Sequence, residues 1–308
     1  MPEIIARLLY WWTAAFARLP WSWLRRIADA LAATWLRLNA REARVARRNL
    51  ELIYSDLPLA EREALLRNIL RTTARQLVET TRLWTHPHAR NLKMIRKRTG
   101  EALLDAALSN GKGLIVAAPH YGNWELLNQW LGARTALAIL YRPPESAIGE
   151  AFLRRVRAAQ DRTEPDRVTQ IRAEGPGIRE LYRRLKSGGV VGILPDQQPK
   201  AGDGAFAAFF GLPAYTMTLL GRLAERTGAT VLFAWCERIG DAPEFALHFE
   251  PAPPGIAAPD PDIACAALNR AVETIARRDP TQYQWTYKRY TLRPSRNPAD
   301  NPYRDLGR

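Results

Sequence analysis

Two stretches of this chain follow one plan: LSNGKGLIVAAPH at residues 108–120 and LKSGGVVGILPD at residues 185–196. Each runs from a helix end through a glycine turn and a short apolar strand to a proline and a polar residue, His120 or Asp196. Ligands of open α/β sheets bind beyond the carboxyl ends of the strands, so this plan places both side chains where such a fold keeps its site. The alternative is that two helix-to-strand turns simply share favourable turn residues.

Short apolar strands alternate with helical segments from residue 100 onward. We expect helices at 101–108, 123–131, 177–186, 216–226 and 262–278, and strands at 114–118, 136–141, 190–194, 230–235 and 245–249. This alternation predicts an α/β fold whose mainly parallel sheet carries helices on both faces. Upstream, residues 42–84 are expected to be helical with a break at Pro58. In FFGLPAYT at 209–216, Gly211 and Pro213 are expected to form a turn ahead of a helix capped near Thr216.

The first 40 residues are apolar, basic and rich in tryptophan. Their uncharged apolar run of ten residues, Leu8 to Ala17, is shorter than the ~20 residues that a spanning helix needs. Residues 1–50 contain nine Arg and five of the ten Trp. Eight of the nine arginines follow the apolar run instead of preceding it, which argues against a secretory signal.

Trp favours the headgroup layer of a membrane, and Arg binds anionic lipid. We therefore expect residues 1–40 to form a membrane-associated helical hairpin ahead of an α/β domain at 41–308, and whether the hairpin spans the bilayer or lies on it stays open. The alternative is a pair of helices packed on the main domain, with Trp filling the core.

The charge balance restricts the partners. With 45 Lys+Arg against 31 Asp+Glu the formal net charge is +14, which favours nucleic acid, anionic lipid or an acidic carrier protein. Cys236 and Cys265 form no CxxC pair, which argues against a disulfide scaffold or a structural zinc site and fits a reducing cytosolic environment.

PHYGNWELLNQW, which starts at Pro119, contains the candidate catalytic residues. Gly122 permits a tight turn, Asn123 can cap the following helix, and Glu125 falls in its first turn. A carboxylate on one nitrogen of His120 would fix the tautomer and leave the other nitrogen to take a proton from a hydroxyl. A structural histidine is the alternative. We expect no metal, because HxxxxE lacks the i, i+4 spacing of a zinc helix and no third ligand stands nearby.

Five motifs in order carry a family resemblance. HYGNWE at 120–125, YRP at 141–143, PDQ at 195–197, FFGLPAYT at 209–216 and QYQWTYKRY at 282–290 resemble the bacterial lipid A biosynthesis acyltransferases of the lauroyl/myristoyl type. These belong to the wider HxxxxD/E acyltransferase superfamily. The resemblance covers nearly the whole chain.

The resemblance implies transfer of an acyl group from an acyl carrier protein thioester to the hydroxyl of a hydroxyacyl chain on a lipid A precursor. This is a step of lipopolysaccharide biosynthesis at the cytoplasmic face of the bacterial inner membrane. It implies a membrane-associated enzyme that needs no cofactor and no nucleic acid.

The resemblance also assigns site residues. It makes His120 the general base and Glu125 its partner, with Asp196 and Gln197 positioning polar groups of the substrates. Arg142 of the YRP motif joins the substrate-binding residues. An arginine upstream of Asp196 is expected as well, and both Arg162 and Arg167 are candidates. Many relatives carry a second acid where this chain has Gln198, so the role of Gln198 stays open.

A basic stretch after the YRP motif is a candidate docking site for the acidic carrier protein. It contains Arg154, Arg155 and Arg157. Such runs are more often solvated helix faces.

Two other functions remain open at this point. The first is acyl transfer by the same residues to another lipid, such as a glycerophosphate or an aminolipid. The second is a non-catalytic basic protein that binds membranes or nucleic acid, against which stands the lack of a helix-turn-helix, zinc or stacking-platform signature.

Overall fold

A seven-stranded sheet forms the centre of the computed structural model, which describes residues 1–141, 146–158 and 167–307. Across the sheet the strands are β1 (Ile95–Thr99), β9 (Phe245–Pro251), β8 (Thr230–Arg238), β2 (Leu114–Ala117), β5 (Val190–Ile193), β3 (Leu137–Tyr141) and β4 (Val168–Arg172). Neighbours pair in parallel except for β8 and β9. The five strands from β8 to β4 therefore end at one edge, and the expected mainly parallel α/β sheet is confirmed.

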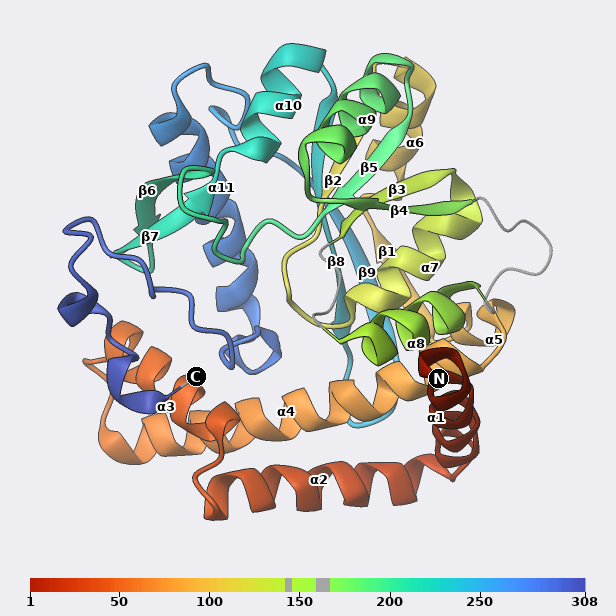
Figure 1. The fold of residues 1–308 in the computed structure, drawn as a ribbon, viewed down its shortest axis with the longest axis vertical. Helices are drawn as coiled ribbons and strands as arrows, with labels where there is room; N and C mark the ends of the chain where they lie inside the picture. Colours follow the sequence, from red (N-terminus) through yellow and green to blue (C-terminus); the bar gives the residue numbers. More distant parts are fainter. Residues whose placement is uncertain (142–145, 159–166, 308) are drawn as a thin grey trace.

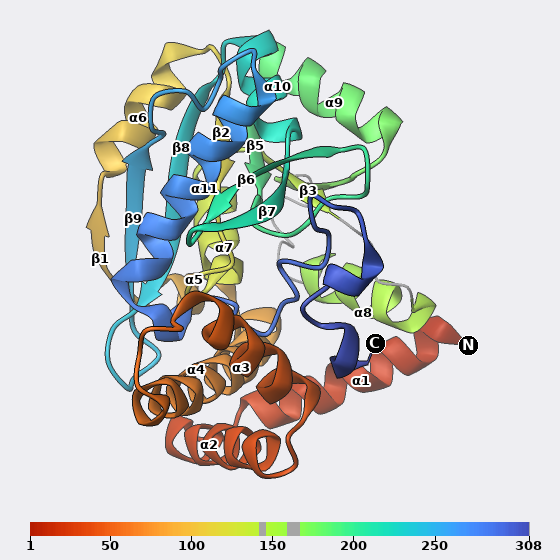
Figure 2. The ribbon, with the colours of Figure 1, turned by 90° about the vertical axis from the view of Figure 1, so that its left-hand side faces the viewer.

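Helices cover both faces of this sheet (Figures 1 and 2). The helices α6 (Glu101–Asn110) and α7 (Trp124–Arg134) lie on one face, and α9 (Gly175–Lys186), α10 (Leu219–Thr227) and α11 (Pro261–Arg278) lie on the other. Side chains of β2 alternate between the two layers: Leu114 and Val116 pack toward α6 and α7, and Ile115 packs toward α9. Because both faces are buried, the central strands are uninterrupted apolar runs.

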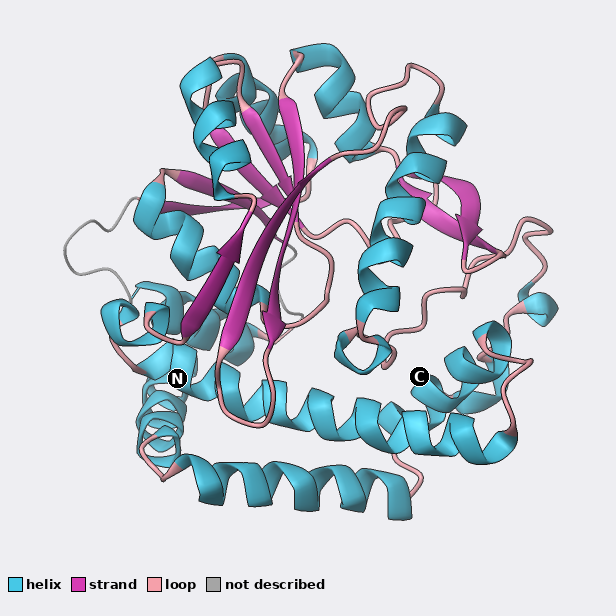
Figure 3. Cartoon of the chain, turned by 180° about the vertical axis from the view of Figure 1, so that it is seen from behind, coloured by secondary structure: helices cyan, strands magenta, loops and turns pink. Residues whose placement is uncertain are grey.

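A layer of helices crosses the end of the sheet at which β2 ends (Figures 1 and 3). It contains α3 (Arg41–Ile53) and the long α4 (Leu59–Thr85), which Pro58 precedes, as expected from the sequence. The short α5 (His88–Leu92) follows. Beyond α11 the chain forms three 3-10 turns and returns along α3; the turns are η1 (Pro280–Gln282), η2 (Pro298–Asp300) and η3 (Arg304–Leu306).

The N-terminal helices α1 (Pro2–Ala17) and α2 (Trp21–Arg37) pack on this layer. They meet at a corner: α2 runs along α4, whereas α1 lies against α4 and α8 (Ala147–Ala158) instead of pairing lengthwise with α2 (Figure 1). Their buried sides consist of small or aliphatic residues, namely Ala6, Ala14 and Ala17 on α1 and Leu24, Ala28 and Ala32 on α2. Within the described ranges, no helix is long and apolar enough to cross a membrane.

Three tryptophans of these helices point away from the packed sides. Trp11 is 58% exposed, Trp12 75% and Trp23 59%. The helices thus pack on the domain, but these three rings do not fill its core. Membrane association of residues 1–40 and the domain boundary after residue 40 stay predictions.

The segment at 204–217 differs from the expectation. It forms an antiparallel hairpin of β6 (Gly204–Phe209) and β7 (Leu212–Met217), and the next helix, α10, begins at Leu219. The prediction that this helix starts at residue 216 was therefore wrong. The chain reverses at Phe210 and Gly211, whose φ values of 49° and 78° are those of a two-residue hairpin turn. Gly211 was correctly assigned to a turn, but this turn joins two strands.

Candidate active site

His120 and Asp196 meet at the end of two neighbouring strands. Leu114 of β2 pairs with Val190 of β5. The same register, continued beyond the ends of the two strands, brings residue 120 opposite residue 196. His120 Nδ1 lies 2.7 Å from Asp196 Oδ1, and the backbone N–H of His120 donates to Asp196 Oδ2 at 2.9 Å. Both carboxylate oxygens of Asp196 are therefore engaged by one residue. Both residues follow strand ends, as expected, and the structure shows in addition that they are in contact.

The surroundings keep Asp196 ionised. The residue is only 5% exposed, and burial alone would raise the pKa of its carboxyl, but the adjacent His120 outweighs burial and the pKa is lowered from its usual value. When neutral His120 donates Nδ1–H to this carboxylate, its Nε2 carries the lone pair. The imidazole is thus oriented to take a proton at Nε2.

The turn after His120 requires glycine. Gly122 has a φ of +57°, and a Cβ at this position would lie 2.1 Å from the carbonyl oxygen of Cys236. The Gly122 N–H donates to Gln282 O at 3.1 Å, and the N–H of Asn123 donates to Cys236 O at 2.8 Å. The side chain of Asn123 accepts from Leu126 N at 3.2 Å, which confirms the expected helix cap of α7.

Side chains of helix α4 also bond this turn. Gln76 Nε2 donates to Gly122 O at 2.6 Å, and Asn123 Nδ2 donates to Glu79 at 3.4 Å. Glu79 also forms an ion pair with Arg238 at the end of β8. Burial raises the pKa of Glu79, although Arg238 favours the charged form. The turn after His120 is therefore fixed by the helical layer, by β8 and by the segment at Gln282.

Glu125 lies in the first turn of α7 and is 7% exposed. The carboxylate at His120 Nδ1 comes from Asp196, a residue to which the sequence analysis gave a substrate-positioning role. The sequence separation of five residues brings Glu125 into the helix after the turn, whereas strand pairing brings Asp196 to the imidazole. A catalytic role for Glu125 stays a prediction.

Arg167, the predicted arginine that lies within the described residues, is not beside His120. Arg167 precedes β4 and donates to Ala133 O at 2.8 Å, at the opposite end of α7 from His120. Arg142 and Arg162 lie outside the described residues.

The predicted docking arginines face the N-terminal helix. Arg154 lies 3.6 Å from Glu3, and the Arg155 guanidinium lies 5.5 Å from the centre of the Tyr10 ring. The side chain of Arg157 is outside the described parts. These two arginines thus contact α1, and docking of the carrier protein on this stretch stays a prediction.

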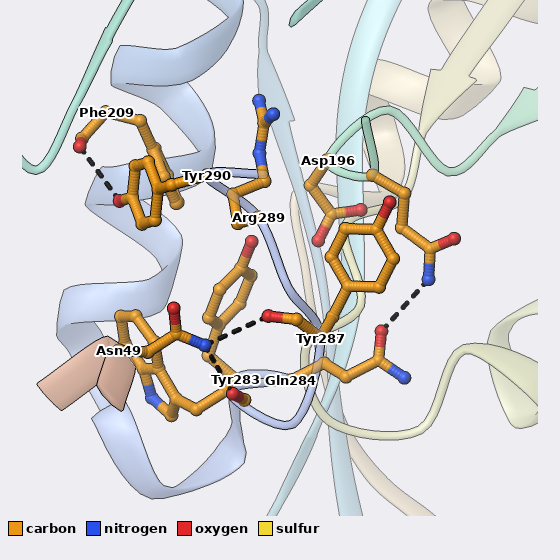
Figure 4. A pocket seen from close by; sticks show the side chains of 10 residues that line it. Asn49, Asp196, Phe209, Tyr283, Gln284, Tyr287, Arg289 and Tyr290 are labelled. Atoms are coloured by element: carbon orange, nitrogen blue, oxygen red, sulfur yellow. Dashed lines mark hydrogen bonds between the residues drawn. The ribbon is translucent and has the colours of Figure 1, made fainter. Parts of the chain in front are cut away.

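A pocket lies beside the His–Asp pair (Figure 4). Its lining comes from four parts of the chain: Asn49, Asp196, Gln197, Phe209, Tyr283, Gln284, Trp285, Tyr287, Arg289 and Tyr290. Phe209 and Tyr290 form one side, and Asp196 with Gln284 forms the other. Burial, together with the charge of Asp196, raises the pKa of Tyr283 well above its usual value, so this hydroxyl keeps its proton. The site combines an oriented imidazole with a partly aromatic pocket.

Most of this lining was missed by the sequence analysis. QYQWTYKRY at 282–290 was recognised as a motif, but none of its residues was predicted to line the site. Asn49 gave no signal at all; it donates from Nδ2 to Trp285 O at 2.6 Å and to Tyr287 O at 2.9 Å, which anchors the motif to α3.

Gln197 occupies the free side of the imidazole. Its Nε2 lies 3.3 Å from His120 Nε2 and 3.1 Å from Gln284 Oε1. The backbone N–H of Gln284 donates to His120 O at 3.0 Å. Gln197, predicted as a substrate-positioning residue, is therefore in contact with the candidate base.

The chain matches a known protein family over nearly its whole length. Residues 3–291 match the family described as bacterial lipid A biosynthesis acyltransferase. The chain is 27% identical over 296 residues to the lipid A biosynthesis palmitoleoyltransferase of Escherichia coli (strain K12), with 92% of each chain covered. It is 24% identical over 283 residues to the lipid A biosynthesis lauroyltransferase of the same strain, covering 92% of this chain and 90% of the relative.

A shorter match reaches a different acyltransferase. The chain is 28% identical over 195 residues to the phosphatidylinositol mannoside acyltransferase of Mycobacterium tuberculosis (strain CDC 1551 / Oshkosh), covering 62% of this chain and 60% of the relative. Because the family match extends over nearly the whole chain, from the N-terminal helices to the 282–290 motif, this protein belongs to the bacterial lipid A biosynthesis acyltransferase family.

Proposed function

We propose that this enzyme transfers an acyl group from an acyl carrier protein thioester to the hydroxyl of a hydroxyacyl chain on a lipid A precursor. His120 Nε2 takes the proton of the acceptor hydroxyl while its oxygen attacks the thioester carbonyl. Asp196 holds the Nδ1 proton and stabilises the imidazolium that forms. The nucleophile belongs to the acceptor, so no nucleophilic side chain of the protein is needed.

The His120–Asp196 pair beside the pocket is the observation that supports the proposal most directly. The 2.7 Å contact fixes Nδ1, and two residues that contact the imidazole, Asp196 and Gln197, also line the pocket. His120 Nε2 faces Gln197, so the acceptor hydroxyl would approach the base on that side. The family supplies the reaction type, acyl transfer.

Charge supports anionic partners. The chain carries a formal net charge of +14, and both an acidic carrier protein and a phosphate-bearing lipid are polyanions. For a carrier protein, attraction between exposed charges weakens when the Debye length falls from about 10 Å at 0.1 M salt to about 3 Å at 1 M. Salt should therefore raise the apparent KM for an acyl carrier protein thioester more than that for acyl-coenzyme A.

We also propose attachment to the cytoplasmic face of the inner membrane through the outer sides of α1 and α2. On α1, Ile4, Leu8, Trp11 and Trp12 share one exposed side, and on α2 Trp23 and Ile27 do the same. Apolar and aromatic residues at helical spacing beside arginines are typical of helices that lie in the interface.

Turnover by the purified protein tests the function. Acyl carrier protein thioester and a Kdo-bearing lipid A precursor are incubated with the enzyme, and the lipid is measured by mass spectrometry. We expect a product heavier by one acyl group in place of one hydroxyl hydrogen. If the precursor stays unchanged and the thioester is not consumed, the proposal is wrong.

A different lipid acceptor is the second candidate. It is favoured by the match to a phosphatidylinositol mannoside acyltransferase, which spans 195 residues. The same residues would then act on a hydroxyl of another lipid. Supplying phosphatidylinositol mannosides, glycerophosphate and aminolipids in the same assay separates the candidates, because consumption of thioester with an unchanged lipid A precursor identifies a different acceptor.

A further inference from the structure

The proton-accepting nitrogen of His120 is already in contact with an amide. Gln197 Nε2 lies 3.3 Å from His120 Nε2. With Nδ1–H donated to Asp196, His120 Nε2 is an acceptor, so the contact is an N–H of Gln197 directed at the lone pair of the base. Before substrate binds, the lone pair of His120 Nε2 is therefore already occupied by an N–H of Gln197.

Gln284 determines which end of the Gln197 amide faces the imidazole. Its Oε1 accepts from Gln197 Nε2 at 3.1 Å, so the NH₂ group and not the carbonyl is held next to His120. The backbone of Gln284 is held beside the imidazole, because its N–H donates to His120 O at 3.0 Å. One N–H of Gln197 is thus bound by Gln284, and the other points at the site of proton transfer.

The arrival of the acceptor hydroxyl leaves this second N–H without its partner. The hydroxyl must take over the Nε2 lone pair, since a single lone pair accepts one hydrogen bond well. The displaced N–H remains within about 3 Å of the attacking oxygen, the distance of an ordinary hydrogen bond. The thioester carbonyl oxygen is bonded to the carbon under attack, so it becomes negative within reach of the same N–H.

We propose that Gln197 is a catalytic residue whose N–H hydrogen bond changes acceptor, from His120 Nε2 to the oxyanion. Gln284 is its positioning residue. The inference rests on the proposed function. The hydroxyl proton moves to Nε2, the C–O bond forms, and the carbonyl electron pair moves onto the oxygen that Gln197 stabilises. When the carbonyl re-forms, the C–S bond breaks, and the thiolate takes the proton from Nε2. Gln197 then returns to the free base.

Gln198 is a matched control, because it is also a glutamine, at the next position, and its side chain bonds Leu292 instead of His120. Its Oε1 accepts from Leu292 N at 2.9 Å. Gln197→Met should lower kcat by roughly 10²–10³-fold, the usual loss for one oxyanion donor, with little change in KM. Gln198→Met should stay within a few-fold of wild type. Gln197→Glu provides an isosteric second variant that lacks the N–H, in case the methionine variant does not fold.

Gln284 provides a second test through non-additivity. Gln284→Met should lower kcat by less than Gln197→Met, and the double variant should be no slower than Gln197→Met alone, because Gln284 acts through Gln197. Independent, multiplying losses would overturn the positioning role. Wild-type kcat in both Gln197 variants, with His120→Ala inactive, would overturn the oxyanion role while leaving the proposed acyl transfer intact. Absence of acyl transfer by the wild-type protein would instead contradict the proposed function.

Discussion

His120 and Asp196 occupy equivalent positions after two neighbouring parallel strands, and the strand register brings them together. Leu114 pairs with Val190, and continuing that pairing places the imidazole of His120 at 2.7 Å from the Asp196 carboxylate. The contact is therefore a product of sheet topology, because its two members are 76 residues apart in the sequence.

The identity of the carboxylate partner is testable by amide replacement. Asp196→Asn keeps the shape but lets the side chain donate to Nδ1, which favours the tautomer with a proton on Nε2. We expect kcat to fall by roughly 10³–10⁴-fold, as found when a catalytic histidine is held in the wrong tautomer. Glu125→Gln should cost less. Steady-state kinetics of both variants decide the assignment, and a larger loss for Glu125→Gln would return the partner role to Glu125.

The free energy of unfolding at acid pH should depend on the same contact between His120 and Asp196. The pKa of Asp196 is lowered in the folded state from its usual 3.8, so the unfolded state binds more protons between the two values and stability rises with pH there. The contribution is fully present above pH 3.8 and is lost as the pH falls through the folded pKa. The difference in unfolding free energy between wild type and Asp196→Asn should therefore shrink from pH 5 toward pH 3. Urea unfolding at several pH values measures it, and a constant difference would contradict the lowered pKa.

Gly122 should not tolerate a side chain. Its φ is +57°, and a Cβ would lie 2.1 Å from Cys236 O, a backbone atom that cannot move alone. A positive φ costs a non-glycine residue ~1–3 kcal/mol, and the clash adds to this. Gly122→Ala should therefore lower both Tm and kcat.

Gly228→Ala is the control for the backbone strain alone. Its φ is +71°, but a Cβ there would have no atom within 4 Å. Equal losses of stability in the two variants would show that the contact with Cys236 is unimportant.

Replacing Trp11, Trp12 and Trp23 with Gln should weaken vesicle binding. These rings are more than half exposed, and burying an aromatic side chain is worth ~1.5–3 kcal/mol, so the partition coefficient should fall by at least about 10-fold. Sedimentation with anionic vesicles measures this. A control replaces exposed apolar residues on other helices, Leu103, Ile178 and Ile263. A similar loss in the control, or none in the tryptophan variant, would place the membrane contact elsewhere.

The sequence predicted the parts of this fold that local pattern determines. The buried strands β2, β5 and β8 were found because both of their faces are apolar, and Asn123 was identified as a cap from its place before a helix. The edge strand β1 was missed. Its residues, IRKRT, are mostly exposed and carry no apolar run, so only pairing with β9 makes them a strand.

The site was predictable only where one local signal was strong. His120 and Asp196 were placed at strand ends, but which carboxylate reaches Nδ1 depends on the order of strands, and no local spacing reports that order. Asn49 and Gln284 could not be identified as site residues from local sequence either. They reach the pocket because α3 and the C-terminal segment lie together, a contact between distant parts of the chain.

The account depends most directly on His120 as the general base. The measurement is kcat for acyl transfer from acyl carrier protein thioester to the lipid A precursor, in His120→Ala and in His248→Gln. His248 stacks on Trp235, with ring centres 5.1 Å apart, and is the matched control. The account predicts that His120→Ala, folded as judged by circular dichroism, loses roughly 10²–10⁴-fold in kcat while His248→Gln stays near wild type. Near wild-type turnover by folded His120→Ala would contradict it.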